Sequence, residues 1–538
     1  NFTTSTDSYN TAVGYDAGAA VTTGIQNTLI GGLAGDALTT GSYSVAVGFQ
    51  ALSTEDAHGQ NTAVGYKALA TLNAGATGNN VAIGFDAGTA VTTATHNTLI
   101  GATAGDALTS GGSNTVLGRD ALSADTLGSR AVAIGEAALQ AQNFTTATEH
   151  YNVAVGYATG ASVTTGIRNT LMGSLSGDAL TDADYNVAIG YSALSSDTLG
   201  SRSVAIGHEA LTSQSFTTAT NAFNVAVGMD AGRAVTTGVE NTLMGGDVGA
   251  SLTEGARNVA VGKSALSTDV LGARNVAVGF EALEKQNFTT ATESYNVAVG
   301  YAAGVSLTTG TANTLVGGLA GQSFTTGIQN SAVGYAALGG LTGAASYNTA
   351  SGTVAGNAIT SGNNNVAIGF GALLAGRPGG AVTTGSNVIG IGNADHTSAH
   401  IQIDWTIASD ARDKTDFTPL DLGLDFVKAL SPLTYKWDKR AKYGDNTADD
   451  YDLSAQTPDG THKEDWLDIG FKAQEVEALE QAAGYNKNNS TNLVSSCSDD
   501  GKQMGLQYSK FVPILVKAIQ EQSALITALT NRIAALEG

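Results

Sequence analysis

The sequence predicts an all-β repeat array, a parallel β-roll or β-solenoid, followed by a small α+β domain that ends in a long helix. Three observations predict it: a glycine that recurs every 17 to 21 residues up to Gly390, a change of composition after Gly392, and an apolar heptad pattern from Val512. A short fixed period means that similar units stack and bury one another. We therefore expect the array at residues 1–392, a junction at 393–408 and the domain at 409–538, with its helix at 508–537.

The repeat is built on an Asn-x-Ala-Val/Ile-Gly motif, whose last residue we call the anchor glycine. It occurs in 22 coils, which we call rungs, and from Gly84 to Gly300 the steps of 17, 17, 17 and 21 residues form a unit of 72. Seventeen residues are too few for a pair of helices and suit one coil of two or three short strands joined by turns. The second rung of each unit has leucine two residues before the anchor, at Leu29, Leu99, Leu171, Leu243 and Leu315.

The repeated strand is apolar on both faces. Alternation places Val153 and Val155 on one face and Asn152 and Ala154 on the other. A strand that is apolar on both faces needs cover on both. We expect one face to fill the coil and the alanine and leucine face to pack on neighbouring chains, which predicts a homo-oligomer.

An asparagine stands four residues before the anchor in 18 of the 22 rungs. In a parallel stack these side chains lie about 4.8 Å apart, where amides can form a ladder of hydrogen bonds along the axis. We assign them a structural role. The ladder is predicted to include Asn27, Asn61, Asn97, Asn152, Asn169, Asn241 and Asn313.

This strand motif resembles the head repeats of trimeric autotransporter adhesins over about residues 8 to 392. The resemblance implies a left-handed parallel β-roll and a homotrimer. The array departs from that family in period, because those heads use somewhat shorter coils and have no four-rung unit. The first residues, Asn1-Phe2-Thr3-Thr4, repeat the insert of the 21-residue steps, so we expect further rungs or another domain before Asn1.

Four ordered segments after the array resemble the intramolecular chaperone auto-processing domain at the end of phage tail fibres, tailspikes and endosialidases. The first contains Ser409, Asp410, Arg412 and Lys414 in the spacing of that family's Ser-Asp-x-Arg-x-Lys start. The others are the segments Leu430 to Trp437, Ile469 to Val476 and Tyr508 to Leu515.

The resemblance implies self-cleavage beside Ser409, with Ser409 as nucleophile and Lys414 as its base. A lysine acts as a base only where burial or nearby cations lower its pKa, so the pair should assemble only in the folded oligomer. The family points to the Ser409–Asp410 bond, which we favour, whereas a five-membered N-to-O acyl shift would cut Ala408–Ser409. The alternative is a helix-capping Ser409, a solvated Lys414 and an Arg412 that pairs with neighbouring carboxylates.

The tail from Val512 predicts a coiled coil, because apolar residues alternate three and four apart through Ile519, Ile526, Leu529 and Leu536. The alternative is a helix that covers its own domain. β-Branched residues at one heptad position with leucine at the other favour two strands, but Gln522 weakens that rule.

Composition excludes several classes. The net charge of −22 argues against a nucleic-acid surface, no apolar run is long enough to span a membrane, and a single cysteine forms no internal disulfide. The histidines show no ligand spacing except His396 and His400, so we interpret them as solvated and predict neither metal nor cofactor.

We therefore expect a homotrimeric phage tail fibre or tailspike, located in the virion tail. Its repeat array would form the shaft and bind a bacterial surface polysaccharide or receptor, and its C-terminal domain would direct trimerisation and cut itself off. Other tail proteins are the expected further partners. The alternatives are a trimeric adhesin on the bacterial cell surface and a tailspike enzyme that degrades polysaccharide.

Overall fold

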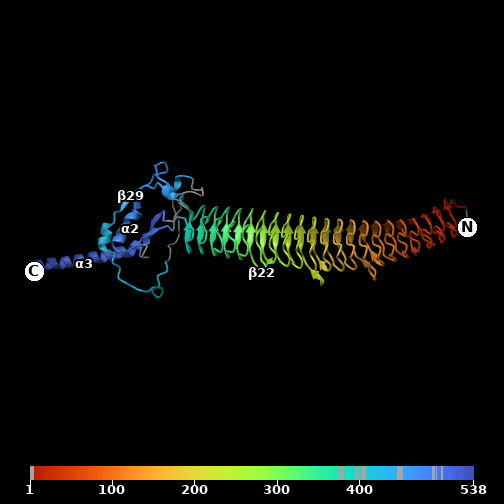
Figure 1. Cartoon of the computed structure of the whole chain (residues 1–538), viewed down its shortest axis with the longest axis horizontal. Helices are drawn as coiled ribbons and strands as arrows, with labels where there is room; N and C mark the ends of the chain where they lie inside the picture. The colour runs from red at the N-terminus through yellow and green to blue at the C-terminus, as the bar shows by residue number, and fades with distance from the viewer. Residues whose placement is uncertain are drawn as a thin grey trace. The chain divides into compact units, whose positions relative to one another are not determined.

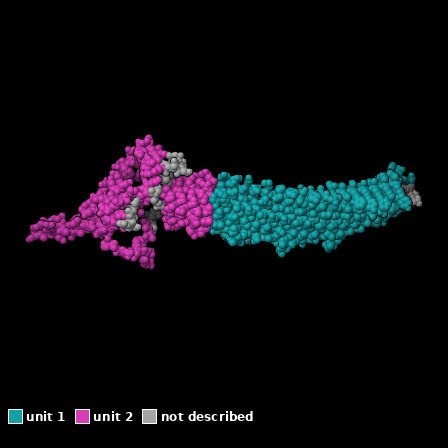
Figure 2. Space-filling view, viewed as in Figure 1, with its two compact units in different colours: residues 1–313 teal, residues 314–538 magenta. Residues whose placement is uncertain are grey.

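The computed structural model describes residues 5–374, 381–393, 395, 396, 399, 400, 407–444, 452–486, 491, 493–498 and 501–538. The chain divides into two compact units, residues 1–313 and 314–538 (Figure 2). Twenty-two strands of three residues, one for each rung, form a parallel sheet. The predicted parallel β-solenoid is thereby confirmed.

Each strand ends one residue before a glycine, which is the predicted anchor in 21 of the rungs. In the last rung β28 ends before Gly392, and the predicted anchor Gly390 lies at the strand centre opposite Ala367, so that assignment is wrong by two residues. The first unit contains β1 Thr11–Val13, β2 Thr28–Ile30, β3 Val45–Val47, β4 Thr62–Val64, β5 Val81–Ile83, β6 Thr98–Ile100, β7 Thr115–Leu117, β9 Val132–Ile134, β11 Val153–Val155, β12 Thr170–Met172, β13 Val187–Ile189, β15 Val204–Ile206, β17 Val225–Val227, β18 Thr242–Met244, β19 Val259–Val261, β21 Val276–Val278 and β23 Val297–Val299. The second unit contains β24 Thr314–Val316, β25 Ser331–Val333, β26 Thr349–Ser351, β27 Val366–Ile368 and β28 Ile389–Ile391.

Successive rungs pair without any shift in register. Strand β11 pairs with β12 so that Ala154 faces Leu171, and Figure 1 shows the rungs of the first unit stacked one on the next. The backbone bonds continue between rungs, as where Val153 N donates to Asn169 O at 2.8 Å. Each rung therefore satisfies the backbone groups of its neighbour, as expected of a stacked coil.

The centre of each strand points into the coil. Ala154, Leu171, Ala188 and Ala205 have no exposed surface, whereas the residues on either side of them are partly exposed. The prediction that the alanine and leucine face packs on neighbouring chains is wrong. The coil closes around these side chains because alanine is small enough to let its walls approach, and it is the valine face that points outward.

The four-rung unit is a packing unit. Leu171 lies against Gly160 of the rung before and Gly177 of its own rung, where an added Cβ would come within 2.7 and 2.9 Å of its Cδ atoms. Where the strand centre is Ala133, the place of those glycines is taken by the buried Leu139. The glycines thus make room for Leu171, and Leu139 fills the equivalent space where the strand centre is alanine, which keeps the interior filled to a similar density.

The rungs contain fewer strands than predicted. Most have one strand, because turns with left-handed residues at fixed places occupy the rest of the coil, as at Leu139 with φ of 50°. A second strand of two residues forms at three places, beside the 21-residue steps. These pairs are β8 Gly128–Ser129 with β10 Thr148–Glu149, β14 Gly200–Ser201 with β16 Thr220–Asn221, and β20 Gly272–Ala273 with β22 Thr292–Glu293.

The region from residue 407 is the predicted small α+β fold. Its helices are α1 Leu424–Ala429, α2 Ala473–Ala482 and α3 Phe511–Glu537, with 3-10 turns η1 Ala411–Asp413, η2 Arg440–Lys442, η3 Leu453–Ala455 and η5 Tyr508–Lys510. Its strands form two antiparallel pairs, β29 Leu433–Tyr435 with β30 Asp468–Gly470 and β31 Ser495–Cys497 with β32 Met504–Leu506.

The core of this fold joins all three helices through Phe426, Val476 and Ile514. Helix α3 is buried only in its first turns, at Phe511, Ile514 and Ala518, and its residues after Ala518 are largely exposed. The interpretation of α3 as a helix that covers its own domain therefore holds for its first two turns alone. Among the described residues, no helix has the length and apolarity that a membrane span requires.

Candidate functional site

The predicted nucleophile and base lie together. Lys414 Nζ donates a hydrogen bond to Ser409 Oγ at 2.6 Å, and both side chains are exposed, as are Ala408, Asp410 and Arg412. The 3-10 turn η1 reverses the chain between them, which lets residues five apart in sequence meet. The N-cap of this turn is Asp410, whose Oδ1 accepts the Arg412 N–H at 2.9 Å.

Asp410, and not Ser409, caps this turn. The Arg412 guanidinium binds the Asp410 carboxylate through Nε and Nη2, at 3.1 and 2.6 Å, and these hydrogen bonds hold the pKa of that carboxyl below its usual range. The Asp410–Arg412 pair leaves the Ser409 hydroxyl free of a capping bond. Its one side-chain partner in this part of the structure is Lys414.

Ser409 and Lys414 are in hydrogen-bond contact, but their surroundings do not provide the burial that a lysine needs as a general base. A lysine ammonium can take up the serine proton only after losing one of its own. Such a loss near neutral pH needs burial or nearby cations. In the single chain both side chains face water, so a cover over Ser409 and Lys414 is needed before Oγ can act as a nucleophile.

The asparagines of the predicted ladder are all buried. Asn27, Asn61, Asn97, Asn152, Asn169, Asn241 and Asn313 have no exposed surface. In the six that precede Asn313, Oδ1 accepts a backbone N–H from the next rung, as Asn152 does from Asn169 N at 2.9 Å, and Nδ2 donates to a backbone carbonyl, as to Gly166 O at 2.7 Å. Side chain to side chain bonds are longer, for example 3.1 Å from Asn313 Nδ2 to Asn296 Oδ1.

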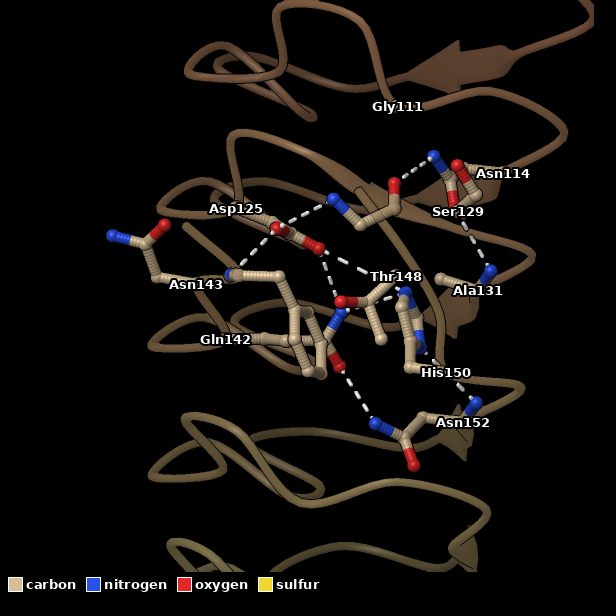
Figure 3. A network of polar contacts seen from close by, with 12 residues as sticks. Gly111, Asn114, Asp125, Ser129, Ala131, Gln142, Asn143, Thr148, His150 and Asn152 are labelled. Atoms are coloured by element: carbon tan, nitrogen blue, oxygen red, sulfur yellow. Dashed lines mark hydrogen bonds and ion pairs between the residues drawn. The ribbon is translucent and has the colours of Figure 1, made fainter. Parts of the chain in front are cut away.

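A second buried network lies inside the coil where the 21-residue step begins. Asp125 Oδ2 accepts from Gln142 Nε2 at 2.8 Å, and Gln142 Oε1 accepts from Asn152 Nδ2 at 2.9 Å. Figure 3 shows these side chains pointing toward one another, with His150 beside Gln142 and Asn152. His150 has no exposed surface, stacks on Phe144 at 5.0 Å and accepts the Asn152 N–H at its Nδ1.

The network is repeated in the next two units. Asp197 with Gln214 and Asp269 with Gln286 make the same bond at 2.6 and 2.7 Å. The place of His150 is taken there by Ala222, one 72-residue unit further along the chain, and by Ser294, two units further. The histidine is thus an addition to a shared network, and it corrects the interpretation of the histidines as solvated.

Burial moves the pKa of two groups in this network. It lowers the pKa of His150 to about 4 and raises that of the Asp125 carboxyl, which the Gln142 hydrogen bond opposes. A histidine whose pKa is lower in the folded chain than the usual 6.5 binds protons more readily when unfolded. Its contribution to stability is complete above pH 6.5 and is lost as the pH falls toward 4.

We expect His150→Ser to make the array more resistant to acid. Between pH 7 and pH 4 the native chain should lose about 3 kcal/mol relative to the variant, because only the native chain carries the buried histidine. Asp125, which lies 3.8 Å from His150 Nε2, is kept in both proteins, so the comparison reports the change at position 150. Thermal unfolding followed by circular dichroism at both pH values measures the difference, and equal losses in the two proteins would contradict the assignment.

A buried carboxylate also organises the C-terminal region. Glu480, at the end of α2, has no exposed surface and accepts the N–H groups of Leu493, Val494 and Ser495 at 3.1, 2.6 and 3.1 Å. It accepts the Ser495 hydroxyl as well. These bonds fix the segment that enters β31 against α2.

Two groups of side chains bring three potential metal ligands within 4.8 Å. They are Glu55, Asp56 and His58, and the more exposed His208, Glu209 and Asp230. The Glu55 carboxylate already accepts hydrogen bonds from His58 N and Ala74 N. Each group supplies fewer side-chain ligands than a closed structural metal site uses, so we assign no ion to either.

Sequence reasoning missed Asp125, Gln142, His150 and Glu480. A signal was present for the first two, because aspartate and glutamine recur at the same two places of successive 72-residue units. Inside a coil, a recurring polar residue has to meet a recurring partner. Glu480 has no such signal, since an acidic residue on a short helix ordinarily faces water.

Comparison with known families adds one match. Residues 409–485 match the family described as chaperone of endosialidase, and the match begins at Ser409 itself. A comparison with curated proteins found no match. The chain thus joins a parallel β-solenoid to a C-terminal region of the chaperone of endosialidase family, an architecture that fits a phage tail fibre.

Proposed function

We propose that this chain is the homotrimeric fibre or tailspike of a bacteriophage tail, with a C-terminal domain that directs trimerisation and then cuts itself off. The solenoid is the shaft and the surface that meets the host, through a bacterial polysaccharide or receptor. The observation that carries the proposal is the contact of Lys414 Nζ with Ser409 Oγ at the first residue of the family match.

The need for such a domain follows from the repeat. Chains built of near-identical rungs can associate one rung or one unit out of step, because each strand then meets the same chemistry. A nucleus that joins three chains at one end sets the register before the shaft forms. Removal of that nucleus afterwards leaves the shaft kinetically trapped.

Helix α3 supports association between chains. After Ala518 its apolar residues Ile519, Ile526, Leu529 and Ile533 remain more than 40% exposed, and they keep heptad spacing. Water-exposed leucine and isoleucine at such positions are the residues that a coiled coil buries.

Self-cleavage then has a balanced route. A covered Lys414 loses its proton, accepts the hydrogen of Ser409 Oγ, and Oγ attacks a neighbouring carbonyl carbon; the peptide C–N bond breaks and the released amine takes that proton. Water hydrolyses the resulting ester and restores the hydroxyl. Attack on the Ala408 carbonyl passes through a five-membered ring, whereas the family points to the Ser409–Asp410 bond, so the scissile bond is left to measurement.

Intact mass after expression tests the proposal. We expect the native chain to yield a C-terminal fragment of 129 residues if Ser409–Asp410 is cut, or of 130 if Ala408–Ser409 is cut. Ser409→Ala and Lys414→Ala should remain full length, and Lys428→Ala, at an exposed lysine on α1, should be cut as the native chain is. Light scattering should give the uncut variants three times the chain mass of 54.0 kDa. A native protein that stays whole, or a cut Ser409→Ala chain, would remove the protease assignment.

A further inference from the structure

The outward face of the solenoid strands is an unbroken apolar surface. We call it the strip and define it by the residues three and one before the anchor in the strands of residues 11–299. The first row contains only valine and threonine, and the second only valine, isoleucine, leucine and methionine. Leu117, Met172 and Met244 are 45, 42 and 44% exposed.

The strip is large enough for a stable interface. Parallel strands lie about 4.8 Å apart and three residues span about 10 Å, so the seventeen strands of the first unit give about 800 Å² for each copy. Stable interfaces bury about 800 Å² on each partner. The largest apolar patch on a monomer is ordinarily about 300 to 600 Å².

The edges of the strip have the composition of an interface rim. On one edge, Arg130 pairs with Glu149 at 2.9 Å and Tyr151 Oη donates to Glu149 at 2.7 Å. Arg274, Glu293 and Tyr295 repeat the cluster two units later, at 2.8 and 2.6 Å. Arginine and tyrosine are enriched in protein interfaces, where they surround an uncharged centre.

The opposite edge carries aromatic residues immediately after the anchor. Phe49, Tyr66 and Phe85 stack from rung to rung with ring centroids 5.8 and 5.1 Å apart, and each remains at least 40% exposed. Their faces extend the apolar surface beyond the strands. The strip is therefore flanked on both sides by side chains that bury large areas at little cost in conformational entropy.

We propose that the strip is the contact between copies of this chain, packed in parallel and in register; the proposal rests on the homotrimer of the proposed function. A second copy is the occupant that the strip matches along its whole length, because each rung offers an identical partner rung. The 47 acidic residues that give the chain its charge of −22 are absent from the strip, so like charges do not meet there. The only side-chain groups of the strip that could hydrogen-bond to a polysaccharide are threonine hydroxyls.

The strip resists some register errors and not others. In the two units after Gly156 the second rung combines threonine with methionine, as in Thr170 with Met172 and Thr242 with Met244, whereas the third rung has valine with isoleucine or valine. A slip by one rung places unlike shapes opposite each other. A slip by 72 residues does not, so the C-terminal domain has to prevent it.

Cysteine crosslinking of the full chain tests this contact. In a Cys497→Ser background, which removes the single native thiol, Val187→Cys places a thiol on the strip and Ser162→Cys places one at an exposed turn outside it. With a flexible bis-maleimide we expect at least tenfold more covalent oligomer from Val187→Cys. Equal yields from the two variants would overturn the proposal.

A second arm tests the register. Two differently tagged chains are coexpressed, one with Val187→Cys and the other with Val259→Cys, so that the two thiols lie one 72-residue unit apart in sequence. We expect each variant to crosslink to its own kind and at least tenfold less to the other variant. Frequent mixed products would show packing out of register. Light scattering tells whether the proposed homotrimer or only the proposed contact is wrong. A monomeric native chain would contradict both, whereas a trimer in which Val187→Cys does not crosslink would contradict the contact alone.

Discussion

Gly245→Ala is expected to break the solenoid locally and to lower its stability by about 3 kcal/mol or more. Gly245 is an anchor glycine with φ of 141°, a region that residues with a Cβ avoid, and an added Cβ would lie 2.7 Å from the carbonyl carbon and oxygen of Gly262 in the next rung. The neighbouring atoms are backbone, which cannot move aside without opening the stack. Because a solenoid is stabilised by contacts between successive rungs, one damaged contact divides the array into two blocks.

The next residue supplies a matched control. Gly246 has no atom within 4 Å of an added Cβ and does not have positive φ, so Gly246→Ala should change stability by less than about 1 kcal/mol. Thermal unfolding by circular dichroism compares the two variants in the same strand-to-turn junction. Equal stability of both variants would show that the close approach of the anchors is not needed.

Glu480→Ala is expected to destabilise the C-terminal region by about 3–5 kcal/mol. The change leaves three backbone N–H groups and the Ser495 hydroxyl without the buried acceptor that they share. All three tryptophans of the chain come after residue 392, so tryptophan fluorescence in urea follows this region without signal from the array. We expect the midpoint of that transition to fall while the circular dichroism transition of the array stays in place.

Glu477 is the control for this change, since it lies on the same helix and is partly exposed. Glu477→Ala removes the same charge without uncovering buried donors, and we expect an effect below about 0.5 kcal/mol. If Glu480→Ala and Glu477→Ala unfold at the same urea concentration, the Glu480 carboxylate does not organise the segment before β31.

The candidate cleavage site was accessible to sequence reasoning only through its motifs. Ser409 and Lys414 are five residues apart, which by itself is common, and the contact between them depends on the turn that Asp410 caps. Their exposure could not be predicted, because it depends on what the rest of the region leaves uncovered. The buried partners of Asp125 and Glu480 depend likewise on segments that lie 17 and 13 or more residues away in the chain.

The sequence by itself determined the period and the parallel stacking of the rungs, because both follow from identical residues recurring at fixed distances. Only the tertiary structure decided which face of the strand is inside. Valine and alanine alternate in either case, and the choice depends on the turns. They close the coil around a space that fits alanine, or leucine where glycines make room for it, which leaves the valine row outside. Packing volume, a property of the whole coil, therefore decided what the alternation of a single strand leaves open.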